Sequence, residues 1–375
     1  MAAVPMSSAK RLRQLLSDPS RMVVAPGVYD GISARLALAQ GFECLYMTGA
    51  GTNMSRLGMA DLGIATFNDM VTNAGMIASI NPSVPLIADA DTGYGGPIMV
   101  ARTVQGYARA GVAGLHIEDQ VQEKRCGHLA GKQLVEREVF YARIRAAKKA
   151  REEIGSEMLI IARTDARAGA GFEEAVERLR GAREAGADAL FLEAMQSEEE
   201  VRKAVKIFEG TPMLLNMVGG GKTPQMSVKE AKEAGFRIMI WPTLLVEAVI
   251  SPLKNALRIL REEGTHDSCE PIGPRALFEV CGLNELMAFD ESVGGKAFGG
   301  QEFVLTLARI DPTLRVTTKP ILDKARTVEV RRGDLYTAEE RERYGGLPNA
   351  GAEVASIRLE KKGRYKVLVE RDGTE

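Results

Sequence analysis

Cysteine and aromatic residues are scarce in this chain. Its 375 residues include four cysteines, a single tryptophan and only 5% aromatic residues. Cys44, Cys126, Cys269 and Cys281 show no short C-x-x-C spacing, and a chain of this length needs no disulfide bonds to stabilise its core. We therefore expect free thiols in a reducing compartment, and a cytoplasmic location.

The sequence also lacks a long apolar run and an excess of either charge. No run reaches the ~18 residues that a membrane-spanning helix needs. The formal net charge of −1 gives no electrostatic reason to bind nucleic acid or an anionic membrane. Neither is expected as a partner, which leaves a small molecule. Residues 1–20 lack the apolar core of a signal peptide, but their basic and serine residues make a mitochondrial location the alternative.

Short apolar segments recur through the first two thirds of the chain, each followed by a segment with the apolar spacing of a helix. This alternation predicts an α/β fold, because parallel strands covered by helices read as continuous apolar segments. Eight such units close naturally into a (β/α)8 TIM barrel. An open doubly wound sheet is the alternative, but no glycine-rich dinucleotide motif follows the first segment. The eight segments are residues 22–26, 44–48, 85–89, 114–118, 159–163, 189–193, 213–217 and 238–242.

Two further features define the ends of this domain. Leu12, Leu15 and Leu16 have helical spacing and predict a helix that ends near Asp18. Residues 1–268 are expected to form the barrel, and 269–375 a C-terminal extension that contacts other subunits or caps the barrel. Within it, the alternating pattern around Lys362 predicts a β-hairpin.

Acidic residues end the third and fourth predicted strands. Asp89 and Asp91 are two residues apart, so on an extended chain their carboxylates point to the same side. Glu118 ends the next predicted strand, and Asp119 follows it. In a (β/α)8 barrel these ends meet at one mouth. Crowded carboxylates repel one another unless a cation lies among them, and an oxygen-only set suits Mg2+ or Mn2+. Solvated strand ends are the simpler alternative.

Polar residues end the later strands as well. Arg163, Glu193 and Asn216 each lie at or next to the end of an apolar segment, and polar residues confined to strand ends predict a pocket. The planar guanidinium of Arg163 suits a substrate carboxylate.

Cys126 lies in the loop after the fourth predicted strand, in "EKRCGHLAGK" (residues 123–132). Lys124, Arg125 and His128 are close in sequence, and positive neighbours lower the pKa of a thiol. We expect Cys126 to transfer a proton or act as a nucleophile. The alternatives are a structural thiol, or a zinc ligand paired with His128, for which a second Cys/His pair is lacking.

The motifs "DADTGYG", "GLHIEDQ", "KRCGH" and "ARTDA" occur in the order and at the spacing of the isocitrate lyase and phosphoenolpyruvate mutase superfamily, which the chain resembles over residues 10–268. The resemblance implies a Mg2+ site at Asp89, Asp91 and Glu118, with Asp61 nearby. It also implies that the loop after the second strand holds the oxo-acid end of the substrate, at Tyr46, Thr48, Gly49 and Ala50.

The lyases of this superfamily carry a proton-donating cysteine in a K-x-C-G-H loop. Lys124, Cys126, Gly127 and His128 match this loop, while Arg163, Glu193 and Asn216 match substrate-pocket positions.

The implied reaction cleaves a carbon–carbon bond of a 2-hydroxy di- or tricarboxylate, of the 2-alkylmalate or methylisocitrate type. Mg2+ would chelate the hydroxyl and its neighbouring carboxylate, and Tyr46 or Glu118 would accept the hydroxyl proton. A 2-oxo acid forms, and Cys126 protonates the carbanion-like fragment, whose charge Arg163 stabilises.

Departures from the family pattern bear on the substrate. Methylisocitrate lyases usually continue the cysteine loop with an arginine where this chain has Leu129, which favours a smaller or more apolar diacid. Oxaloacetate acetylhydrolases, the main alternative, share most site residues but have a pocket serine near the end of the eighth strand, where Pro242 and Thr243 stand. Phosphonate mutases and hydrolases lack the cysteine loop.

A catalytically inactive barrel that binds partners is the non-enzyme alternative, and the intact polar set at the strand ends argues against it. Members of the superfamily commonly assemble as tetramers or dimers of dimers with an exchanged C-terminal helix. Residues 245–266, long and apolar on one face, are the candidate for such an exchange. The alternative is that this segment caps its own barrel.

Overall fold

The computed structural model describes residues 6–265, 272–295, 358–359 and 365–366. The chain divides into two compact units, Met1–Cys281 and Gly282–Glu375. The domain boundary that the composition predicts, between residues 268 and 269, lies outside the described residues.

The first unit contains a closed barrel of eight parallel strands in sequence order. Its closure is made by β1 and β8, where Val23 lies opposite Ile238. The predicted (β/α)8 barrel is therefore confirmed, and the open doubly wound sheet is wrong. The strands are β1 Val23–Val28, β2 Leu45–Met47, β3 Leu86–Asp89, β4 Gly114–Glu118, β5 Leu159–Thr164, β6 Ala189–Leu192, β7 Met213–Asn216 and β8 Ile238–Trp241.

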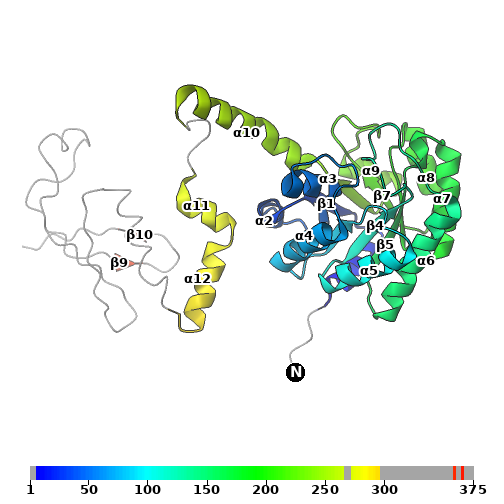
Figure 1. The fold of residues 1–375 in the computed structure, drawn as a ribbon. Helices are drawn as coiled ribbons and strands as arrows, with labels where there is room; N and C mark the ends of the chain where they lie inside the picture. Colours follow the sequence, from blue (N-terminus) through cyan, green and yellow to red (C-terminus); the bar gives the residue numbers. More distant parts are fainter. Residues whose placement is uncertain (1–5, 266–271, 296–357, 360–364, 367–375) are drawn as a thin grey trace, which may run out of the picture. The chain divides into compact units, whose positions relative to one another are not determined.

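Helices follow the strands, and those after β1 to β7 lie around the barrel (Figure 1). Glycines in the left-handed region end three of them: Gly186 after α7, Gly235 after α9 and Gly264 after α10. None of the helices in the described part of the chain combines the length and apolar character that a bilayer crossing requires. The helices of this unit after the first are α2 Gly31–Ala39, α3 Gly49–Thr52, α4 Phe67–Ile80, α5 Pro97–Arg109, α6 Arg137–Glu153, α7 Phe172–Ala185, α8 Glu198–Ile207, α9 Val228–Ala234, α10 Leu244–Glu263 and α11 Gly273–Val280.

The amino-terminal helix α1, Ser8–Ser17, belongs to the inner core of the barrel. It ends where the sequence predicts, with Asp18 as its C-cap. Leu12, Leu15 and Leu16 are buried in one cluster with inward-facing strand residues such as Ile161. This helix therefore closes the end of the barrel at which the strands begin.

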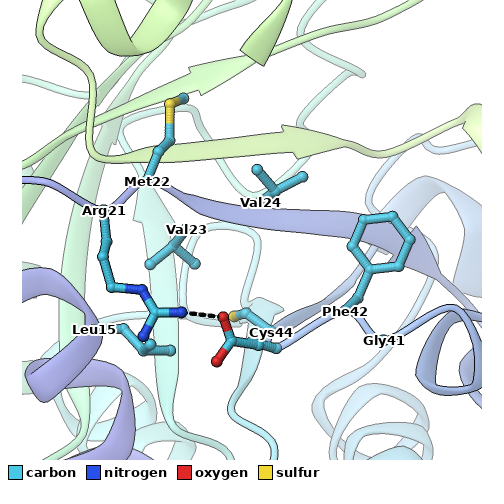
Figure 2. A pocket seen from close by; sticks show the side chains of 9 residues that line it. Leu15, Arg21, Met22, Val23, Val24, Gly41, Phe42 and Cys44 are labelled. Carbon is cyan, nitrogen blue, oxygen red and sulfur yellow. Dashed lines mark hydrogen bonds and ion pairs between the residues drawn. The ribbon is translucent and has the colours of Figure 1, made fainter. Parts of the chain in front are cut away.

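A pocket of about 200 Å³ lies at the same end, beside the segments that lead into β1 and β2 (Figure 2). Leu15, Phe42 and Cys44 are among its lining residues, and Arg21 forms an ion pair with Glu43 at its edge. Cys44 is buried. Because active groups of such barrels gather where the strands end, this pocket is not the candidate site.

The second unit contains the helix α12, Leu283–Ser292, and two short strands. Strand β9, Arg358–Leu359, pairs with β10, Tyr365–Lys366, in the antiparallel sense. The antiparallel pairing on either side of Lys362 is confirmed, and the residues that join the strands lie outside the described ones.

Replacing Leu12 by alanine should lower the free energy of unfolding by about 2–5 kcal/mol, because it leaves a cavity in the inner core. Leu12 is 0% exposed, whereas Ile98 on α5 is 87% exposed, so Ile98→Ala should change stability by less than about 0.5 kcal/mol. Urea unfolding of both variants measures the difference. Equal small losses would contradict the role of α1 as a closing element.

Candidate active site

Five strands deliver polar side chains to the carboxyl-terminal end of the barrel. Asp89, Glu118 and Asn216 are the last residues of β3, β4 and β7, Arg163 is the penultimate residue of β5, and Glu193 follows β6 directly. All five side chains are buried. Since parallel strands end on the same side of a barrel, the structure brings together the residues that the sequence predicts for one pocket.

A lysine holds two of the acids in this mouth. The Nζ of Lys124 lies 2.6 Å from Asp61 Oδ1 and 2.6 Å from Asp91 Oδ1. Burial opposes the charge of Lys124, but Asp91, Glu118 and Asp61 outweigh it and raise its pKa well above the ordinary value. Burial also raises the pKa of Asp91, to about 7. The lysine therefore stays charged and neutralises part of the acidic cluster.

Asp89 and Asp91 meet for a different reason than the sequence suggests. β3 ends at Asp89, and Asp91 has a φ of +46°, in the left-handed region, so the alternation of an extended strand does not set its direction. Instead, Asp89 Oδ1 accepts the Asp91 N–H at 2.8 Å. A Cβ at Gly49 would lie 2.4 Å from Asp89 Oδ2. Only glycine allows the loop after β2 to approach the acid this closely.

Arg163 lies among three carboxylates. Its Nε is 2.9 Å from Asp165 Oδ2 and 3.3 Å from Glu118 Oε2, and its Nη2 is 3.3 Å from Glu193 Oε2. Burial works against the charge, but these acids raise the pKa of Arg163 well above its ordinary value. The Nδ2 of Asn216 donates to Glu193 Oε2 at 3.0 Å. The guanidinium is thus fixed before any substrate arrives.

The Cys126 loop covers this arginine cluster. A Cβ at Gly127 would lie 2.5 Å from Arg163 Nη2 and 2.7 Å from Glu193 Oε2, so glycine is required at the closest approach. His128 Nε2 is 3.6 Å from Glu193 Oε1. The sequence match of the cysteine loop thus corresponds to a real contact with the pocket residues.

The predicted lowering of the Cys126 pKa is wrong. Burial of the half-buried thiol raises its pKa, and the opposing effects of Arg163 and Lys124 are smaller. Lys124 cannot act as a free positive neighbour, because its charge is engaged by Asp61 and Asp91. The thiol therefore keeps its proton at neutral pH, which suits an acid better than a nucleophile.

Strand β2, which contains Tyr46, and the loop after it use their polar groups in contacts within the protein. The Tyr46 hydroxyl forms a 2.8 Å hydrogen bond with His116 Nε2, and burial raises the pKa of Tyr46 well above its ordinary value. Thr48 Oγ1 accepts the Gly51 N–H at 3.2 Å and so caps α3, which contains Gly49 and Ala50. Tyr46 is therefore a phenol rather than a phenolate at rest.

Asp119 does not belong to the mouth, although the sequence places it beside Glu118. Its carboxylate accepts the Thr164 hydroxyl and the Asp165 N–H, and it lies 3.3 Å from Arg178 Nη1 on α7. Successive side chains of a strand point to opposite faces, so Glu118 faces the interior and Asp119 the helix layer. Asp119 joins β4 to β5 and α7.

The acids predicted to bind a metal have suitable chemistry for a hard cation. Asp89, Asp91 and Glu118 offer only oxygen ligands and are buried, and Glu118 Oε2 accepts no hydrogen bond. However, the described residues contain no group of three or more His, Cys, Asp or Glu side chains already placed to hold an ion. These carboxylate oxygens are ligands that suit Mg2+ or Mn2+. One of them, Asp91 Oδ1, is paired with Lys124 Nζ.

Two residues of this site were missed from the sequence. Gln120 Nε2 donates to Glu118 Oε1 at 2.9 Å, and Lys132 Nζ lies 2.7 Å from Asp165 Oδ1. Gln120 could have been found, because it stands two residues after Glu118, at the spacing of one strand face. Lys132 carries no such signal, since its partner lies in the next β/α unit.

Comparison with protein families gives a match over most of the barrel. A model of the phosphoenolpyruvate phosphomutase family matches residues 12–261. The chain is 40% identical to a 2,3-dimethylmalate lyase of Eubacterium barkeri over 260 residues, 69% of this chain and 88% of that protein. It is 42% identical to a 2-methylisocitrate lyase of Aeropyrum pernix over 288 residues, 76% of this chain and 91% of that protein.

Solved structures agree with these relatives. A 2,3-dimethylmalate lyase superposes with a TM-score of 0.77 and 54% identity, covering 79% of this chain and 98% of its own. An oxaloacetate acetylhydrolase bound to 3,3-difluorooxalacetate superposes with a TM-score of 0.77 and 51% identity, covering 78% of this chain and 99% of its own. A phosphonopyruvate hydrolase in complex with oxalate and Mg2+ superposes with a TM-score of 0.67 and 27% identity, covering 76% of this chain and 99% of its own.

Alkylation of Cys126 by iodoacetamide should rise with pH about a midpoint above ~8.5, the ordinary value for a thiol, because burial raises the pKa of this side chain. Peptide-resolved mass spectrometry separates Cys126 from the other cysteines. The urea-unfolded protein is the control and should show the ordinary midpoint. A folded-state midpoint at or below that of the unfolded protein would show that the positive neighbours dominate after all.

Proposed function

Because the chain belongs to the phosphoenolpyruvate mutase/isocitrate lyase superfamily, we propose that this carbon–carbon lyase cleaves a 2-hydroxy di- or tricarboxylate into a 2-oxo acid and a second carboxylate. Substrates of the 2-alkylmalate or methylisocitrate type suit the site. The observation that carries the proposal is the position of the Cys126 thiol in a loop whose next residue, Gly127, packs against Arg163 and Glu193. Burial raises the pKa of this thiol, which favours its protonated form. A proton donor and a cation that could bind a substrate carboxylate would thus lie close together in one site.

The proposed reaction needs one side chain that accepts a proton and another that donates one. Glu118 is the better acceptor, because its Oε2 accepts no hydrogen bond, whereas the Tyr46 hydroxyl is bonded to His116. Loss of the 2-hydroxyl proton to Glu118 lets the neighbouring carbon–carbon bond break, with its electron pair leaving on the departing carboxylate fragment. Cys126 then transfers its Sγ proton to that carbon. The proton held by Glu118 returns to solvent, which reprotonates the thiolate.

Charge on the departing fragment needs fixed donors. Arg163 would supply such donors, because its guanidinium is buried and fixed in orientation by its acids and would need no further rearrangement to donate to the fragment. Asn216 Nδ2 donates to both carboxylate oxygens of Glu193, and this pair fixes one side of the site. Lys124 and His128 belong to the same loop as the thiol.

We propose Mg2+, or Mn2+ in its place, as the cofactor, held by Asp89, Asp91 and Glu118. When bound, the cation would lower the pKa of the substrate hydroxyl and orient its carboxylate. The oxygen-only chemistry of these buried acids supports this, as does the Mg2+ in the phosphonopyruvate hydrolase structure.

The Cys126 loop supports a proposal about the size of the substrate. Leu129 is half exposed and offers no charge for a third carboxylate, which favours a dicarboxylate such as a 2-alkylmalate. Hydrolysis of oxaloacetate to oxalate and acetate is the second candidate, supported by the 51% identity with an oxaloacetate acetylhydrolase. Pro242 and Thr243 follow β8 directly, where that activity would place a serine.

We also propose a homo-oligomer, a tetramer or a dimer of dimers. Leu253, Leu257 and Leu260 on α10 are 54–66% exposed, as are other apolar side chains on α11 and α12, so contacts between subunits would remove them from water. Residues 269–375 would then serve subunit contact.

We further propose a cytoplasmic location. Cys44, Cys126 and Cys281 are free thiols, which suits a reducing compartment.

A panel of 2-alkylmalates, 2,3-dimethylmalate and 2-methylisocitrate should contain a substrate that releases a 2-oxo acid, measured by coupled reduction with NADH. Removing divalent cations with EDTA should abolish the activity, and Mg2+ or Mn2+ should restore it. Silence across the panel in the presence of Mg2+ would contradict the lyase proposal, and release of oxalate from oxaloacetate would favour the hydrolase.

Cys126→Ser should reduce turnover on the best substrate by ~10²-fold or more, because a serine hydroxyl is a poorer proton donor at this position. Cys281→Ser, which changes an exposed thiol, is the matched control and should keep wild-type turnover. Steady-state kinetics compares the two variants. Near wild-type turnover in Cys126→Ser would reduce this residue to a structural one.

A further inference from the structure

Lys132 is the last residue of the Cys126 loop (residues 123–132) and has no part in the proposed chemistry. Its side chain is only 4% exposed, unusual for a lysine unless it is paired. Its Nζ donates to the Gly127 carbonyl at 2.5 Å and to Asp165 Oδ1 at 2.7 Å. One ammonium thus binds the loop backbone and a side chain of the next β/α unit.

Asp165 links this lysine to the arginine cluster. The same carboxylate accepts Arg163 Nε at 2.9 Å and Arg163 Nη2 at 3.2 Å. Lys132 and Arg163 therefore share one acid. The position of the loop and the orientation of the guanidinium depend on the same carboxylate.

The residues around the thiol are held by their backbones. The Gln120 side chain donates to the Arg125 carbonyl and accepts the Arg125 N–H, at 2.9 and 3.1 Å. The Cys126 N–H donates to the Asp61 carbonyl at 3.2 Å. Lys132 holds Gly127, the residue that follows the cysteine.

Gly127 needs such support more than its neighbours do. The space beside Arg163 requires a glycine, and glycine has the largest backbone freedom to lose on ordering. It also has no side chain with which to fix itself. A charge-assisted hydrogen bond to its carbonyl is about twice as strong as a neutral one.

We propose that Lys132 is a positioning residue, which fixes the Cys126 thiol over the pocket by joining the Gly127 carbonyl to Asp165 and thereby to Arg163. The catalytic consequence rests on the proposed function, in which Cys126 donates the proton. The structural consequence does not, because it concerns the thiol in the resting protein.

Alkylation of Cys126 by iodoacetamide at one pH, without substrate, tests the structural part. Lys132→Met removes the ammonium and should speed the reaction by about tenfold or more, the scale of one lost hydrogen bond to a charged group. Lys132→Arg keeps a charged donor and should stay closer to wild type. Lys149→Met, on the exposed face of α6, is the matched control and should not change the rate.

Cys44 serves as an internal control in the same digest, because it is buried at the other end of the barrel. If Cys44 becomes reactive together with Cys126 in Lys132→Met, the effect is general unfolding and the proposal is wrong. An unchanged Cys126 rate in Lys132→Met would also overturn it.

Kinetics tests the catalytic part. On a substrate of the wild-type enzyme, Lys132→Met should lower kcat with a smaller change in KM, and Lys132→Arg should recover part of kcat. An unchanged kcat would overturn the catalytic role. If the wild-type protein cleaves nothing on the panel, the proposed function fails, while the alkylation rates still decide whether Lys132 holds the loop.

Discussion

The mouth of this barrel depends on buried charges that neutralise one another. Arg163 is surrounded by Glu118, Asp165 and Glu193, and Lys124 lies between Asp61 and Asp91. Removing one partner from such a group leaves an uncompensated buried charge and costs about 3–5 kcal/mol. The pairs are therefore mutually required, and they give the site a fixed arrangement of charge before a substrate enters.

The parallel barrel makes this arrangement possible. Each of five strands contributes a polar residue at its end. Because the strands are parallel, those ends lie on one side, and closure between β1 and β8 arranges them in a ring. Glycines at 49 and 127 then let two loops approach the acids and the arginine more closely than any side chain would permit. Apolar strands build the core, and their last residues build the site.

Burial also decides what Cys126 can do. A thiol near basic residues is commonly a thiolate, but here the cations nearest to it are engaged by carboxylates, and desolvation raises its pKa. A protonated, half-buried thiol beside a fixed guanidinium is suited to giving a proton to a carbanion. The chemistry of the proposed lyase thus follows from the pairing of charges rather than from the composition of the loop.

The sequence by itself determined the eight strands, their parallel order, the amino-terminal helix and the set of polar strand ends, because apolar segments and their spacing are local properties. Family motifs added the roles expected of Cys126 and the acids. Only the tertiary structure decided which acid meets which base: that Asp119 faces the helix layer, that Asp91 turns in the left-handed region and binds Lys124, and that Lys132 reaches Asp165. These contacts join residues of different β/α units, and their electrostatic effects depend on burial and distance, which no local pattern contains.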